Sequence, residues 1–146
     1  MSGPVTSRLA GVTARLATVG DRVTLTAGEQ VAAAVTRQLA ADGAPLSRYR
    51  GGGGPPRVEA RRAGADTAEV VPTSGAGQIG ILQSGARPHR IGHARVVLAF
   101  QGGEYVTGAV NHPGSPARRS FTRGTESGRP AAVDAARRVF DGVTGG

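Results

Sequence analysis

The stretch "ARVVLAFQGGEYVTGAV", residues 94–110, places two valine-containing apolar segments on either side of a glycine pair. Valine and aromatic residues favour strands, so 94–100 and 104–110 are both expected to be strands. Gly102 and Gly103, which follow Gln101, can supply the positive φ angles of a tight turn. The pattern predicts a β-hairpin, which we expect to form the core of the fold together with the helices.

The segment that follows, "NHPGSPARRSF" (residues 111–121), combines two prolines with a glycine and two arginines. Each proline removes a backbone donor, fixes its own φ and pushes the preceding residue to an extended conformation, while the glycine permits a turn. Such a segment stays extended at low entropic cost and suits an arm laid on a neighbouring protein. An ordinary surface loop is the competing interpretation. The expected arm residues are His112, Pro113, Gly114, Ser115, Pro116, Arg118, Arg119 and Phe121.

Within this arm, the last residues have the chemistry of an interface. Arg118 and Arg119 are expected to pair with carboxylates of the neighbour, because a guanidinium binds carboxylates in a bidentate geometry. Phe121 is expected to fill a pocket there.

The first 44 residues are expected to be helical. A first apolar face, which Gly20 interrupts, and a second face recur at spacings of three and four residues. The second helix is indicated by the capping-box spacing of Thr26 and Glu29, and Gly43 ends it. One long helix is the alternative. The two faces comprise Leu9, Val12, Leu16 and Val19, and then Val31, Val35 and Leu39.

A connector, two strands and a last helix complete the chain. Residues 45–56, "PLSRYRGGGGPP", neither pack nor continue a helix and are expected to be a flexible loop. The segments 57–62 and 67–72 alternate valine with charged residues, which predicts two short strands with one solvated face. A short helix is expected from Pro130 to Phe140, with Val133, Ala136 and Phe140 on one face.

This layout predicts an α+β fold in a single domain, residues 1–146. Its parts are a helical segment (1–44), the glycine- and proline-rich loop (45–56), and a region of small antiparallel sheet, extended arm and C-terminal helix (57–146).

The composition limits the function. The formal charge is +8, and all eighteen basic residues are arginine. A chain free of lysine and rich in Ala, Gly and Val is typical of a GC-rich genome, so part of this excess reflects codon usage. Three Phe and two Tyr leave few aromatic rings for stacking on bases. A sequence-independent nucleic-acid binder is therefore the second hypothesis, and a solvated basic surface without a binding role is the simplest alternative. The chain lacks cysteine, a long apolar run and a signal peptide, so we expect a soluble protein made in the cytoplasm.

The remaining motifs argue against an enzyme. "GAGQIG" (75–80) has dinucleotide-site spacing, but Gly85 and Pro88 break a following helix and the next acid is Glu104, so we expect a mobile loop. The histidines lack a third converging ligand, and no nucleophile elbow is present. We therefore expect no catalytic, cofactor-binding or metal-binding residues. The histidines are His89, His93 and His112.

Residues 85–121 resemble the C-terminal half of a family of phage head-tail joining proteins from long-tailed, non-contractile phages, variously called neck, tail-completion or minor tail components. Members typically show G-[TA]-R-P-H-x-I, a strand ending in Leu-x-Phe, a glycine-containing hairpin, V-x-H-P-G-T and a Pro-Phe. Here Ser115 replaces the Thr, and Arg119-Ser120 stand in place of Pro-Phe. The matching residues are Gly85, Arg87, Pro88, His89, Ile91, Leu98, Phe100, Val110, His112, Pro113 and Gly114.

The resemblance implies a structural virion protein without catalytic activity or cofactor, assembled in the host cytoplasm as a homo-oligomeric ring at the head-tail junction. Its partners would be a head-side connector or stopper and a tail terminator or tail tube protein. The 111–121 arm and the 45–56 loop would reach these neighbours, and arginines would line the passage for exiting DNA with non-specific contacts.

Overall fold

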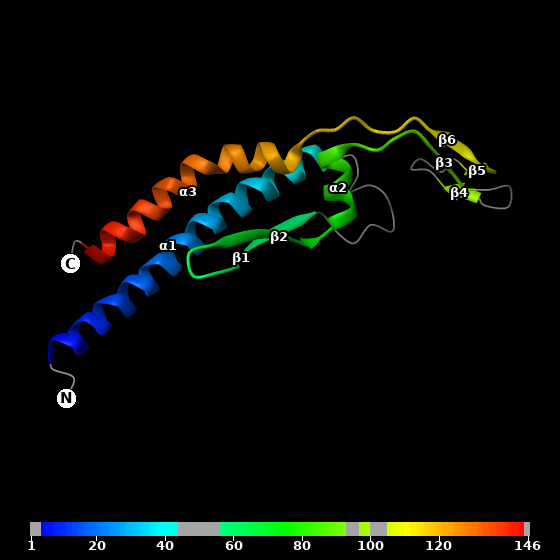
Figure 1. Ribbon diagram of the computed structural model, residues 1–146. Helices are drawn as coiled ribbons and strands as arrows, with labels where there is room; N and C mark the ends of the chain where they lie inside the picture. The colour runs from blue at the N-terminus through cyan, green and yellow to red at the C-terminus, as the bar shows by residue number, and fades with distance from the viewer. Residues whose placement is uncertain (1–3, 44–55, 93–96, 100–104, 145–146) are drawn as a thin grey trace.

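The computed structural model describes residues 4–43, 56–92, 97–99 and 105–144. Helix α1 (Pro4–Gly43) runs between helix α3 (Ser120–Thr144) on one side and a hairpin of strands β1 (Arg57–Arg62) and β2 (Ala68–Ser74) on the other (Figure 1). The short helix α2 (Ala76–Ser84) covers the end where α1 stops and α3 begins. These helices and small antiparallel sheets confirm the predicted α+β class.

Helix α1 is one continuous helix of 40 residues, which confirms the single-helix alternative. A second start at Thr26 and Glu29 is wrong, because both residues lie in its interior. Gly20 does not end the helix, and its carbonyl accepts a bond from Thr24 Oγ1 at 2.8 Å as well. A glycine costs a helix about 1 kcal/mol relative to alanine, which packing of the following turns offsets.

Helix α3 packs on α1 at very short range through two glycines. A Cβ built on Gly124 would lie 2.6 Å from Val35 Cα, and one built on Gly128 would lie 2.8 Å from Ala34 Cβ. Ala132 continues this small-residue face four residues later and is buried. Because neither glycine has a side chain, the two backbones approach more closely than larger residues allow.

The predicted start of the C-terminal helix at Pro130 is wrong. The helix begins ten residues earlier, at Ser120, and Pro130 lies inside it, exposed. A proline in a helix interior costs about 3 kcal/mol, since it removes a backbone donor. The helix also buries a different face than expected. Ala132 and Ala135 are buried, whereas Val133 and Phe140 of the predicted apolar face are 42% and 53% exposed.

Strands β1 and β2 confirm the strands predicted at 57–62 and 67–72, and they pair antiparallel. Val58 is the buried residue of β1, and Thr36 Oγ1 of α1 donates to its carbonyl at 3.4 Å. Gly28 lets this hairpin approach α1, because its Cβ would lie 3.1 Å from Ala60 Cβ. An ion pair between Arg62 and Asp21, 2.9 Å long, joins the hairpin to the middle of α1.

The loop predicted for 75–80 is instead the start of α2. Gly75 begins it with a φ of 65°, and a Cβ at this position would lie 2.9 Å from Pro56 Cα. Ile79 and Leu82 supply the apolar side chains that hold α2 on the body. The expected end is confirmed, since α2 stops at Ser84 and Gly85 caps it with a φ of 75°.

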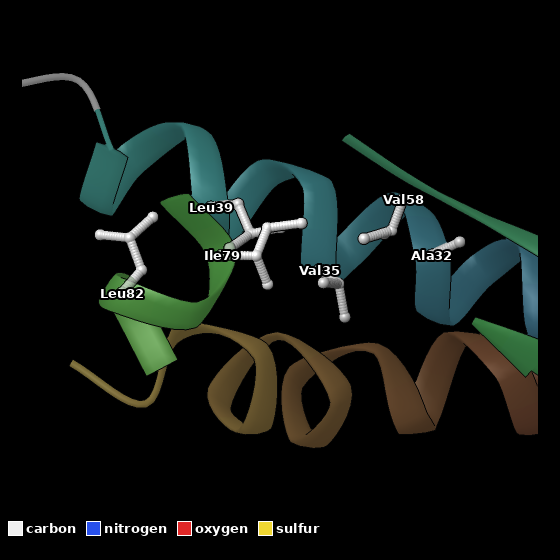
Figure 2. Close-up of a cluster of buried hydrophobic side chains, with 6 residues drawn as sticks. All are labelled: Ala32, Val35, Leu39, Val58, Ile79 and Leu82. Carbon is white, nitrogen blue, oxygen red and sulfur yellow. The ribbon is translucent and has the colours of Figure 1, made fainter. Parts of the chain in front are cut away.

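The hydrophobic core is small and lies where α1, β1 and α2 meet (Figure 2). Val35 and Leu39 are fully buried, and Phe121 of α3 packs against them from the side. The expectation that the 94–110 hairpin forms part of this core is wrong. Its described strands, 97–99 and 105–107, lie away from this core in Figure 1, and the core residues are Ala32, Val35, Leu39, Val58, Ile79 and Leu82.

A long two-stranded ribbon extends away from this body (Figure 1). Its stem pairs β3 (His89–Ile91) with β6 (Val110–His112), and further out β4 (Val97–Ala99) pairs with β5 (Tyr105–Thr107). The pairing predicted between 94–100 and 104–110 is therefore confirmed for residues 97–99 and 105–107, whereas Val110 pairs with Ile91 of β3 instead. The turn residues 101–103, together with Phe100, His93 and the loop at 45–55, lie outside the described residues.

No helix of the described chain has the length and apolarity that crossing a membrane requires.

Replacing Gly124 with alanine tests the close helix contact. The new methyl group would overlap the backbone of α1 at Val35, so we expect the free energy of unfolding to fall by about 1–3 kcal/mol. Gly20→Ala is the matched control, because nothing lies within 4 Å of its Cβ, and it should gain up to about 1 kcal/mol. Urea unfolding followed by circular dichroism measures both, and equal effects would refute the close packing.

Candidate functional site: the base of the ribbon

The two motifs, separated in the sequence by residues 92–109, lie side by side at the base of the ribbon. Residues 85–91 form one strand of the stem and 110–115 form the other. Ala86 and Ser115 exchange two backbone hydrogen bonds, both 2.9 Å long. The structure thus brings the predicted motif and the first half of the predicted arm into one unit.

Two glycines with positive φ let the two backbones lie in close contact at this base. Gly85 has a φ of 75°, and its Cβ would lie 2.4 Å from the carbonyl oxygen of Ser115. Gly114 has a φ of 85°, and its Cβ would lie 2.4 Å from the carbonyl oxygen of Ala86. Each glycine therefore faces the backbone of the opposite strand, and no other residue fits either position without moving that backbone.

The two described histidines stack across the stem. His89 and His112 are direct partners in the β3–β6 register, with ring centroids 4.9 Å apart. His89 Nδ1 lies 2.8 Å from the carbonyl oxygen of Arg87, so this nitrogen carries a proton and donates it. His112 Nδ1 accepts a bond from the Gly114 amide at 3.0 Å, so it is unprotonated. Both rings therefore help to fix the path of the strands.

Exposed arginines surround this stem. Arg87 and Arg90 are exposed on the outgoing strand, and Arg118 and Arg119 are exposed on the returning chain. Six arginines and one glutamate, Glu104, occupy positions 87–123, which makes the segment strongly basic. The described part of this segment can therefore meet an anionic surface.

The returning chain is fastened to the body by a polar network around Asp42, at the end of α1. Ser120 Oγ, fully buried, donates to Asp42 Oδ2 at 2.7 Å, and Gln38 Nε2 donates to the same oxygen at 2.8 Å. Arg118 Nη1 donates to the Asp42 carbonyl oxygen at 2.7 Å, and Arg123 lies 3.7 Å from the carboxylate. The network fixes where the arm ends and α3 begins.

These contacts also set the acidity of Asp42. The hydrogen bond from Gln38 lowers its pKa, burial opposes this effect, and Ser120 and the charges of Arg123 and Arg118 lower it further. The net result is a pKa below the ordinary value of 3.8. The ionised form is thus the one that the folded protein stabilises.

Gln83 of α2 caps the first turn of α3. Its Oε1 accepts bonds from the amides of Phe121 and Thr122, at 3.0 and 3.3 Å, and its Nε2 donates to Thr122 Oγ1 at 2.8 Å. The free amides at a helix start need such acceptors, and here the acceptor comes from another helix. A sequence search for local caps therefore misses it, as it also misses the roles of Asp42 and Ser120.

The second half of the predicted arm has roles within its own chain. Phe121 lies in the first turn of α3, is half-buried and packs against the core. The guanidinium of Arg118 bonds to Asp42, as described above. Arg119 is exposed and has a φ of 52°, the one positive φ of a non-glycine residue in the described chain. Of the residues after Pro116, Arg119 is thus the best placed to reach a neighbour.

The GAGQIG segment follows β2 and forms the first part of α2, a helix of nine residues that ends before Gly85. β2 and β1 are nevertheless antiparallel, so the described chain here lacks the parallel βαβ unit of a dinucleotide site. Among the described residues, no three acidic or histidine side chains are close enough to hold a metal ion.

Comparisons with known proteins do not assign this chain to a family. No family model, no curated protein and no solved structure matches it.

Gly114→Ala tests the close backbone contact at the base of the ribbon. Both Gly114 and Gly108 have positive φ, which costs an alanine about 1–2 kcal/mol, but only Gly114 has backbone within reach of a new Cβ. We expect the amides of Ala86 and Ser115 to exchange hydrogen roughly tenfold faster in Gly114→Ala than in Gly108→Ala. Hydrogen exchange read by mass spectrometry measures these amide exchange rates. Equal rates in the two variants would contradict the close backbone contact at Gly114.

Acid unfolding tests the Asp42 network. Because the pKa of Asp42 is lower in the folded protein, its contribution to stability is present above pH 3.8 and is lost as pH falls through the lowered value. We expect the melting temperature of Asp42→Asn to be lower than that of the unmodified protein at neutral pH. The two should converge below pH 3.8, and a constant difference down to pH 2 would show that the charge of Asp42 is not involved.

Proposed function

We propose that this chain is a structural virion protein that forms a ring at the head-tail junction of a long-tailed phage. The observation that supports it most is the ribbon, which leaves the body and adds nothing to its core among the residues described. The resemblance of residues 85–121 to head-tail joining proteins lies on this same ribbon and its base.

A lone ribbon of two strands is a poor structure in water. Among the described strands, none pairs with either edge of the ribbon, and two-stranded hairpins are marginally stable by themselves. The stem strands β3 and β6 have three residues each, and Arg90 and Asn111 are exposed on them. A neighbouring protein that covers the ribbon would supply the missing contacts, which is the role of an assembly arm.

The total surface agrees with a subunit of an assembly. The chain exposes 10336 Å². A compact monomer of 14.7 kDa exposes about 6,900 Å² by the usual scaling of surface with mass. The excess is surface that contacts with other chains can bury.

The close backbone contact at Gly85 and Gly114 gives the arm a defined direction. A Cβ atom built on either glycine would lie 2.4 Å from a carbonyl oxygen of the opposite segment, so the two backbones are in direct contact. This contact prevents the two segments from sliding along one another. The Asp42 network then holds the end of the arm on the body. A ring needs the same geometry in every subunit, so a fixed base suits this function.

Exposed arginines support a second candidate function, sequence-independent nucleic-acid binding. A protein that binds phosphates alone releases counterions, so its affinity falls steeply with salt. In the ring, the same arginines would touch exiting DNA weakly. The free chain would then bind DNA poorly, and only a dedicated binder would show tight, salt-sensitive binding as a monomer.

Copy number in purified particles tests the proposed ring. Quantitative mass spectrometry against a known head protein should find on the order of six to twelve copies of this chain per particle, as one closed ring requires. Hundreds of copies would place the chain in the tail tube or shell instead. Its absence from particles would refute a virion role and favour the nucleic-acid binder.

Variants at the ribbon base test the arm itself. Particles made with Gly114→Ala in place of the original chain should contain heads and tails that fail to join, while Gly108→Ala should join more of them, because only Gly114 lies against backbone. Electron microscopy of lysates counts joined and separate particles. Normal joining in Gly114→Ala would sink the arm hypothesis.

A further inference from the structure

The helix pair leaves an apolar groove along one side. α1 and α3 pack closely near the core and diverge toward the chain termini (Figure 1). Between them lies a groove of about 380 Å³, the volume of roughly a dozen water molecules. Alanine and valine side chains form most of its wall, and the charged residues Glu126 and Arg129 also line it. The main lining residues are Ala27, Val31, Ala132, Val133, Ala136 and Glu126.

Residues 11–18 of α1 are not covered by any described part of their own chain. Every residue from Gly11 to Thr18 is exposed, including Val12 at 53% and Leu16 at 63%. In the sequence these two continue the stripe that starts at Leu9, so the helix presents apolar groups at spacings of three and four. An isolated helix of this length is marginal in water, so its folded form benefits from a partner.

We propose that residues 11–18 of α1 in one copy of this chain dock into the α1–α3 groove of the next copy. The groove offers an apolar wall, and the helix offers apolar side chains at helical spacing, which is the usual way a helix binds a groove. Leu16 lies eleven residues from Ala27 along the same helix, about 16 Å, so a rigid α1 cannot fill its own groove. A second copy carries the matching segment.

Charge and surface area agree with this occupant. Arg15 is exposed between Val12 and Leu16, and Glu126 at the groove rim has no ion pair among the described residues. The excess surface of the chain, over 3,000 Å² by the scaling given above, exceeds the roughly 1,600 Å² that two neighbours of standard contact size would cover on one subunit.

The contact joins two different surfaces, so it is head-to-tail. Such contacts close into a ring when the rotation between copies allows it and form an open filament otherwise. Ring closure rests on the proposed function, whereas the docking of helix into groove does not. Self-association of the purified chain therefore tests the docking alone, and particle joining tests the function.

Mixing two blocked variants gives the sharpest test. Leu16→Arg blocks the helix and Val133→Arg blocks the groove, and both positions are exposed enough that the subunit fold should persist. In sedimentation velocity the unmodified chain should associate, and each variant alone should do so roughly ten- to a hundredfold more weakly. An equal mixture should form dimers and nothing larger, because one variant keeps the helix and the other keeps the groove.

Ile81→Arg is the matched control, because Ile81 is an exposed apolar residue on α2, at 39%, outside both surfaces. It should associate like the unmodified chain, and circular dichroism should show the same helix content in all variants. An unmodified chain that stays monomeric at high concentration would overturn the proposal. So would a mixture of the two blocked variants that stays monomeric, or a loss of association in Ile81→Arg.

Discussion

The close approach of α3 to α1 at Gly124 and Gly128 is the contact on which the rest of this structure depends. The absence of two side chains lets α3 lie directly against Val35 and Ala34 of α1. That approach brings Ser120 within hydrogen-bond reach of Asp42 and Phe121 onto the core. A chain with so few aromatic residues has little apolar bulk, so close backbone packing supplies the contact that large side chains provide elsewhere.

The ribbon inherits its position from this packing. Its returning strand is held by Asp42 and Gln83 where α3 begins, and its outgoing strand leaves directly from the end of α2 at Gly85. Between these points the close backbone contact at Gly85 and Gly114 fixes how the two strands lie against each other. The body therefore holds both ends of the ribbon in place, and the ribbon extends outward from it, as the proposed head-tail joining subunit would require.

The surfaces that the monomer leaves uncovered lie at opposite ends. The ribbon extends from the end where α1 stops, while the exposed start of α1 lies at the other end, with the chain termini (Figure 1). A subunit with two separate contact regions can engage a neighbouring copy with one and a different protein with the other. The proposed helix docking between copies and the proposed contact of the ribbon with a neighbouring protein would thus use different parts of the chain.

Sequence patterns were sufficient where the signal is local. Valine alternation identified β1 and β2, the pairing of 97–99 with 105–107 was predicted correctly, and Gly43 and Gly85 were correctly placed at helix ends. These features depend on residues within one turn or one strand. The α+β class follows from them.

Tertiary contacts decided the rest. Capping spacing at Thr26 and the proline at 130 both predicted helix starts, yet packing on the neighbouring helix carries α1 through the first and α3 through the second. The spacing of Gly124 and Gly128 four residues apart was the signal that could have revealed this packing. The sequence by itself determined the strands β1, β2, β4 and β5, the helix ends at Gly43 and Gly85, and the basic charge. Only the tertiary structure decided which glycines touch backbone, and that the two motifs form one ribbon base, because such contacts join residues far apart in the chain.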